Sequence, residues 1–150
     1  MGERNYLQKG YEELTPQQAA TELLGHLPPG SKIAIASRGE DYVQSYIDAL
    51  TERGYHVRTT PSSHTGVQDF CFLLQAQREL VGTMRSTYTR WAALLGRAER
   101  VQLYSMDSPW TRQAHGTPDR FPESLQYHWR RPDLKTKIHY RIFSSNATLY

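Results

Sequence analysis

The chain has little cysteine and no long apolar segment. Its one cysteine, Cys71, excludes an internal disulfide. Because Cys71 stands between Phe70 and Phe72, we expect a buried, unreactive thiol rather than a nucleophile. No run of residues is apolar enough to cross a membrane, and the N-terminal residues contain no signal-peptide hydrophobic region. The sequence therefore predicts a soluble globular protein without a membrane segment.

Several motifs of well-known enzymes are also missing. There is no G-x-x-x-x-G-K-[ST] phosphate loop and no G-x-G-x-x-G following the first predicted strand. A G-x-S-x-G nucleophile elbow is absent as well, which argues against a serine hydrolase. The six histidines do not have the spacing of metal ligands. We therefore expect a protein with no metal and no resident cofactor.

The composition is that of one globular domain with a slight excess of positive charge. Of its 150 residues, 38% are hydrophobic and 22% are charged, and the formal net charge is +3. A charge of this size suits an anionic ligand. It is too small to predict nucleic-acid binding, so we expect no nucleic-acid partner.

Helical and strand-like segments alternate along the chain. Thr15 and Pro16 predict a helix start, and Gly25 a helix end. Four short β-rich runs follow, separated by helices that open near Asp41, at Asp69 and at Thr87. The predicted strands are Ile33–Ser37, Tyr55–Thr60, Glu79–Thr83 and Val101–Ser105. This alternation predicts an α/β fold, a Rossmann-like parallel sheet of about four strands flanked by helices.

Right-handed crossovers give this sheet the strand order 2-1-3-4. We expect residues 1–105 to form the Rossmann-like domain. Residues 106–150, which are rich in basic and aromatic side chains, should form an irregular extension packed on it, with a late strand near Ile138–Phe143. On the helices, the spacing of apolar residues predicts buried faces that include the following residues: Phe70, Leu73, Leu74, Tyr88, Trp91, Ala92 and Leu95.

The most informative segment is the turn that leads from the third strand into the helix at Thr87. In parallel sheets, ligands bind at the carboxyl ends of the strands beside the point where the strand order reverses. Here those ends carry hydroxyl and guanidinium groups, and a helix N-terminus adds free N–H groups that favour phosphate. The candidate binding residues are Ser37, Arg38, Arg85, Ser86 and Thr87. Simpler interpretations remain open: Ser86 and Thr87 can serve only as a helix cap, and Arg38 can pair with Glu40 or Asp41.

The chain from roughly Thr15 to Ser105 resembles the donor-binding half of fucosyltransferases of the α1,2/α1,6 and protein O-fucosyltransferase superfamily, which have a GT-B-like architecture. The likeness depends mainly on Ser86-Thr87-Tyr88-Thr89-Arg90-Trp91, which resembles the family's Ser-Thr-Phe-x-Trp-Trp type motif. The resemblance implies that Ser86 and Thr87 contact the diphosphate of GDP-fucose and that Asp69 recognises guanine. It also implies metal-independent, inverting transfer of fucose to a glycan hydroxyl.

The chain departs from the family pattern at Tyr88 and Arg90, where the family has Phe and Trp. The family's His-x-Arg-Arg-x-Asp motif lies upstream of the donor block, whereas here its letters occur only at His128–Asp133. The acceptor-binding half is missing, so an acceptor domain elsewhere in a longer protein is expected. Two alternatives stay open: a non-catalytic module that binds a nucleotide, glycan or protein, and a nucleotide-binding domain unrelated to sugars. The expected compartment is the secretory lumen for a longer eukaryotic transferase, and the cytoplasm otherwise.

Overall fold

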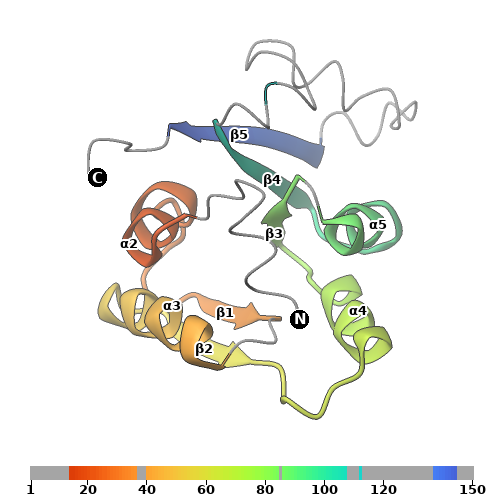
Figure 1. Ribbon diagram of the computed structural model, residues 1–150, viewed down its shortest axis with the longest axis horizontal. Coiled ribbons are helices and arrows are strands. Elements are labelled where there is room, and N and C mark those ends of the chain that lie inside the picture. The colour runs from red at the N-terminus through yellow and green to blue at the C-terminus, as the bar shows by residue number, and fades with distance from the viewer. Residues whose placement is uncertain (1–13, 37–39, 85, 108–111, 113–136, 145–150) are drawn as a thin grey trace. The chain divides into compact units, whose positions relative to one another are not determined.

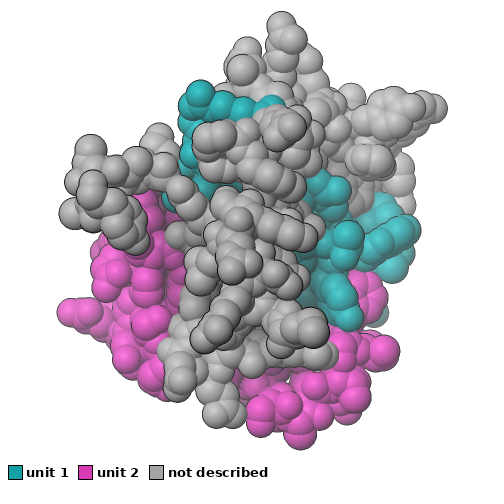
Figure 2. Space-filling model, in the orientation of Figure 1, with its two compact units in different colours: residues 1–13, 73–150 teal, residues 14–72 magenta. Residues whose placement is uncertain are grey.

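The computed structural model describes residues 14–36, 40–84, 86–107, 112 and 137–144 (Figure 1). These residues form an α/β structure with helices and two small parallel sheets. The chain divides into two compact units, which are shown in different colours in Figure 2. One unit is Leu14–Phe72, and the other is Leu73–Tyr150 together with Met1–Glu13. Within the described ranges, no helix combines the length and the apolarity that a membrane span requires.

The first unit opens with the predicted helix cap. Thr15 precedes α2 (Pro16–Gln18), and its Oγ1 accepts a hydrogen bond from the backbone N–H of Gln18 at 3.1 Å. The Gln18 Oε1 in turn accepts a hydrogen bond from the backbone N–H of Thr15, which completes a capping box. The helix then passes into a π-helical turn, η1 (Ala19–Leu23), whose buried side chains are Ala19, Ala20 and Leu23.

The strands of the first unit lie parallel and share one covered face. In the register of β1 (Lys32–Ile35) and β2 (His56–Thr59), Ile33 pairs with Val57. The connecting helix α3 (Glu40–Glu52) is followed by Gly54, whose φ of 86° explains the glycine at this helix end. Side chains of the sheet pack on a small core made of Ala20, Ala49, Leu50 and Tyr55.

Helix α4 (Gly66–Leu74) begins one turn earlier than the sequence analysis predicts. The Thr65 Oγ1 accepts a hydrogen bond from the backbone N–H of Gln68, and the backbone N–H of Thr65 donates one to the Gln68 Oε1. A second capping box therefore starts the helix before Asp69. The predicted buried side of this helix is only half-buried, at Phe70, Leu73 and Leu74, and none of its residues is fully buried. The prediction of a buried thiol is wrong, because Cys71 is exposed.

The second unit contains a three-stranded parallel sheet in the order β3-β4-β5. Its strands are β3 (Glu79–Thr83), β4 (Arg100–Asp107) and β5 (Ile138–Ser144). The late strand predicted near the C-terminus is therefore confirmed. Because β4 is the central strand, side chains on both of its faces are buried, among them Val101, Gln102 and Leu103.

The predicted neighbours β1–β2 and β3–β4 both occur. The described hydrogen bonds, however, form sheets of two and three strands rather than one sheet of four. Most of the predicted C-terminal extension, namely residues 108–111, 113–136 and 145–150, lies outside the described residues. The expected boundary between residues 105 and 106 stays a prediction.

Of the buried face predicted for helix α5 (Thr87–Leu95), only Ala92 is buried. Tyr88, Trp91 and Leu95 are 47%, 56% and 62% exposed, so their assignment to the core is wrong. The buried residues of the helix are Thr89, Ala92 and Ala93. The reason is the close approach of α5 to Gly82 of β3, where only small side chains fit between helix and strand.

Candidate functional site

The candidate site is the turn between β3 and α5, where Ser86 is the N-cap. The Ser86 Oγ accepts a hydrogen bond from the N–H of Thr89 at 3.2 Å. Its own N–H donates to the carbonyl of Thr83, and its carbonyl accepts from the N–H of Arg90. Ser86 is therefore a structural cap, as the simpler interpretation holds. The hydroxyl proton of Ser86 is not used by this cap, so it can still be donated to an anion.

Thr87 supplies further hydrogen-bond donors at this turn. It is the first residue of α5, and its side chain is exposed. Among the described residues, no partner accepts a hydrogen bond from its backbone N–H, as is usual in the first turn of a helix. The hydroxyl and N–H of Thr87 and the hydroxyl of Ser86 therefore offer three donors where the helix dipole is positive.

The end of β3 holds this turn in place. The Met84 N–H donates to the Tyr104 carbonyl at 2.8 Å, and the Met84 side chain is fully buried. At Gly82, an added β-carbon would stand 2.3 Å from the Oγ1 of Thr89, so the first turn of α5 lies directly against the strand. The donors of Ser86 and Thr87 thus stand where α5 begins against the end of β3.

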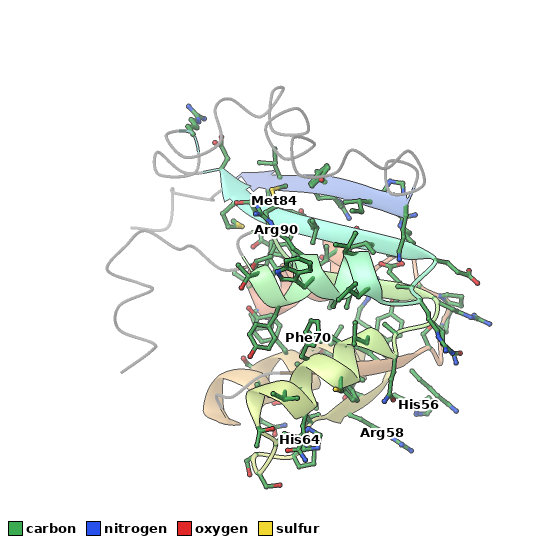
Figure 3. The ribbon with its side chains drawn as sticks, turned by 90° about the vertical axis from the view of Figure 1, so that its right-hand side faces the viewer. His56, Arg58, His64, Phe70, Met84 and Arg90 are labelled. Carbon is green, nitrogen blue, oxygen red and sulfur yellow. The ribbon has the colours of Figure 1, made fainter. Side chains whose placement is uncertain are left out.

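Arg90 is a residue of this region whose importance the sequence analysis missed. It lies in α5, four residues after Ser86, and its Nε atom is buried without a hydrogen-bond partner. Figure 3 labels Arg90 on the helix and Met84 at the end of β3. The available sequence signal is an arginine one turn after a serine cap, because helical residues four apart lie on the same face.

A second feature lies at the carboxyl end of β4. Asp107 accepts hydrogen bonds from Arg112, at 2.7 Å from Nε and 2.6 Å from a terminal nitrogen, so the ion pair is bidentate. The hydrogen bond from Arg112 holds the pKa of the Asp107 carboxyl below its usual value. Neither residue was a candidate in the sequence analysis.

Asp69 lies in α4 and belongs to the first unit, whereas Ser86 and Thr87 belong to the second. Its Oδ1 is 3.3 Å from the Nδ1 of His64, which comes just before the helix. The two side chains are only 14% and 26% exposed. The Asp69 carboxylate is therefore oriented by a histidine, a relationship that the sequence analysis did not predict.

The other predicted site residues, Ser37, Arg38 and Arg85, lie outside the described residues. Among the residues that the structure describes, no three histidine, cysteine or carboxylate side chains come together as a metal site would require. Comparisons with protein-family models, with curated proteins and with solved structures found no match to this chain.

Proposed function

We propose that this chain binds a nucleotide sugar through the turn between β3 and α5. The observation that carries the proposal is the set of donors at this turn, contributed by Ser86 and Thr87 at the positive end of α5. A diphosphate is the ligand group that suits it, because its oxygens accept several hydrogen bonds at once and carry the complementary charge.

Within this proposal the ligand is a guanine sugar nucleotide, GDP-fucose, and the chain is a fucosyltransferase-like domain. The motif from Ser86 to Trp91 supports the choice of ligand, since it resembles the family motif that contacts the donor diphosphate. Asp69 is assigned separately to the guanine base, because a carboxylate can accept hydrogen bonds from its N1–H and 2-amino groups. A Rossmann-like strand order of 2-1-3-4 and a glycan acceptor are parts of the same proposal.

Calorimetric titration of the purified chain with GDP, GDP-fucose, UDP and ADP tests the ligand class. We expect the guanine nucleotides to bind most tightly. Thr87→Val should weaken GDP binding several-fold, while the matched variant Thr51→Val, at an exposed threonine near the end of α3, should not. Equal affinity for the three nucleoside diphosphates would overturn the assignment of guanine.

Asp69 is tested by its own variant. Asp69→Asn should reduce the preference for GDP over ADP, because an amide presents one acceptor oxygen in place of two. Asp48→Asn is the control, since it changes an exposed helical aspartate in the same unit.

The second candidate is a binding module that holds the nucleotide but transfers no sugar. The position of the Arg-Arg motif favours it, because this motif follows the donor block instead of preceding it. Release of GDP from GDP-fucose in the presence of glycan acceptors would reject this candidate, whereas tight binding without release would support it.

A further inference from the structure

The two strands of the first unit carry basic side chains on one exposed face. Their apolar side chains pack on the core described above, so the residues that alternate with them point to the opposite face of the sheet. The residues on this second face are all exposed: Lys32, Ala34, His56 and Arg58. In the register of the sheet Lys32 lies beside His56, and Arg58 follows His56 on the same strand. Every titratable side chain on this face is therefore basic.

No acidic side chain neutralises these three bases. Among the residues that the structure describes, Lys32, His56 and Arg58 take part in no ion pair. Acidic residues nevertheless outnumber lysine and arginine in the described part of this unit, and all of them lie in helices, most of them in α3. Helix α3 contributes Ala49 and Leu50 to the core on the other side of the sheet. The basic face is therefore a local feature of the strands and not part of a generally basic surface.

The strand β2 also has a free edge. In the part of the chain that the structure describes it pairs only with β1, and it is again the edge strand in the order 2-1-3-4 proposed above. The His56 N–H donates to the carbonyl of Ser31, just before β1, at 2.9 Å, so every second residue of β2 faces β1. The N–H and C=O groups of Val57 and Thr59 therefore face away from β1, where a further strand can pair with them.

A basic edge selects its partner by charge. Two basic edges repel each other, so β2 is protected against pairing with a second copy of itself. An acidic strand meets opposite charges instead, because carboxylates at every second position have the same period as His56 and Arg58. Nucleic acid is the poorer match, since this face has no phenylalanine, tyrosine or tryptophan for base stacking and the unit has an excess of acidic residues.

We infer that β2 binds an extended acidic segment of a partner protein, which adds to the sheet as a further strand. The N–H and C=O groups of Val57 and Thr59 pair with the main chain of that segment, and its acidic side chains lie beside His56 and Arg58. Lys32, next to His56 in the register, adds a further basic group to the same face. The main-chain hydrogen bonds supply affinity, and the charges determine which sequence is accepted.

Fluorescence anisotropy of labelled peptides tests the charge requirement with the full chain. The probe is a short peptide of alternating glutamate and threonine, and the comparison peptide has lysine in place of glutamate. Combined His56→Glu and Arg58→Glu substitutions should weaken binding of the glutamate peptide about 10-fold or more and create binding of the lysine peptide. Arg53→Glu, at an exposed arginine between α3 and β2, is the matched control and should keep the affinity of the unchanged protein. Equal affinity of the unchanged protein for both peptides, or tighter binding of an oligothymidylate, would overturn the inference.

Strand addition is tested at Thr59, which does not belong to the basic face. Thr59→Pro removes the outward N–H but leaves the hydrogen bonds between β2 and β1, as proline at a sheet edge does. It should weaken binding of the glutamate peptide several-fold, whereas Thr59→Val, which keeps the N–H, should bind as the unchanged protein does. In hydrogen-exchange NMR of the unchanged protein, the Thr59 amide should gain protection when the peptide is added. Unchanged binding by folded Thr59→Pro would overturn the inference.

Peptides with modified main chains test the same hydrogen bonds without altering the protein, so the inference stays testable if Thr59→Pro does not fold. One glutamate peptide is N-methylated at its glutamates and another at its threonines. Only one of these two sets of nitrogens faces β2 in an added strand, because main-chain groups alternate in direction along a strand. One modified peptide should therefore lose binding and the other should keep it. Equal binding of both would show that the peptide is held by charge alone and overturn strand addition.

Discussion

Gly82 of β3 lies against Thr89 of α5 so closely that a β-carbon on Gly82 would be 2.3 Å from the threonine Oγ1 and 2.8 Å from its Cβ. Rotation of the threonine cannot relieve the second contact. We therefore expect Gly82→Ala to lower the free energy of unfolding by about 1–3 kcal/mol, as overpacked cores do, measured by urea denaturation.

The double variants give this prediction its control. Thr89→Ala removes the contacts with the threonine Oγ1 and Cγ2 but keeps the contact with its Cβ. Gly82→Ala should therefore lower the free energy of unfolding less in the Thr89→Ala background than in the unchanged protein. If Gly82→Ala were as stable as the unchanged protein, the close approach of strand and helix would be refuted.

Ser86→Asp separates helix capping from anion binding. Aspartate caps helices as well as serine and interacts favourably with the dipole, so the stability of the chain should be retained within about 0.5 kcal/mol. Its negative charge, however, repels a phosphate, and binding of GDP or pyrophosphate should fall below detection. Calorimetry and urea denaturation of the same sample measure the two effects. Retained anion binding would place the ligand away from this turn.

Lys137 stabilises the C-terminal end of α5. Its Nζ donates to the carbonyl oxygens of Ala93 at 3.0 Å and Gly96 at 3.4 Å, where the helix dipole is negative. Lys137→Met should lower the free energy of unfolding by about 0.5–1 kcal/mol, and added salt should reduce this difference. Lys32→Met, at an exposed lysine in β1, serves as the control and should have little effect.

The Asp107–Arg112 pair predicts a stability change in acid. Because the pKa of folded Asp107 lies below its unfolded value, the pair contributes fully above the unfolded pKa and is lost as the pH falls through the folded pKa. Any difference in stability between the unchanged protein and Asp107→Asn should therefore be constant near neutral pH and shrink below about pH 4. Arg112→Met should return the Asp107 pKa, followed by NMR, toward its ordinary value. A pKa that is the same with and without Arg112 would contradict the prediction.

The two faces of α5 are tested by substitutions one residue apart. Trp91 is 56% exposed and Ala92 is fully buried. Trp91→Ser should change the free energy of unfolding by less than about 1 kcal/mol, whereas Ala92→Leu should be destabilising by about 1–3 kcal/mol. If Trp91→Ser were the more destabilising substitution, the face with Trp91 would be the buried one, as the apolar spacing predicts.

Local signals predicted much of this fold. The cap at Thr15, the glycine at residue 54 and the late strand near Ile138 all depend on neighbouring residues, and the structure contains each of them. The start of α4 could also have been predicted from the sequence, because Thr65 and Gln68 have the same spacing as Thr15 and Gln18 in the first capping box. Placing the start at Asp69 overlooked that repetition.

Features that depend on distant contacts could not be predicted. The apolar spacing of α5 predicts that the face with Trp91 and Leu95 is buried. Instead, Gly82 lets the strand approach the face of small residues, and Trp91 and Leu95 are exposed. The burial of the Arg90 Nε is likewise a consequence of tertiary packing. At the candidate site, the sequence located the Ser86 cap correctly but gave no sign of the partner of Asp69.

The central place of β4 has a consequence for how the chain is made. On one side β4 pairs with β3, which lies shortly before it in the sequence. On the other side β4 pairs with β5, which is synthesised much later. Until Ile138–Ser144 has been synthesised, β4 exposes a row of unpaired N–H and C=O groups beside the apolar Val101 and Leu103. Such an edge is a template for strand pairing between chains, so a chain shortened before Lys137 should self-associate.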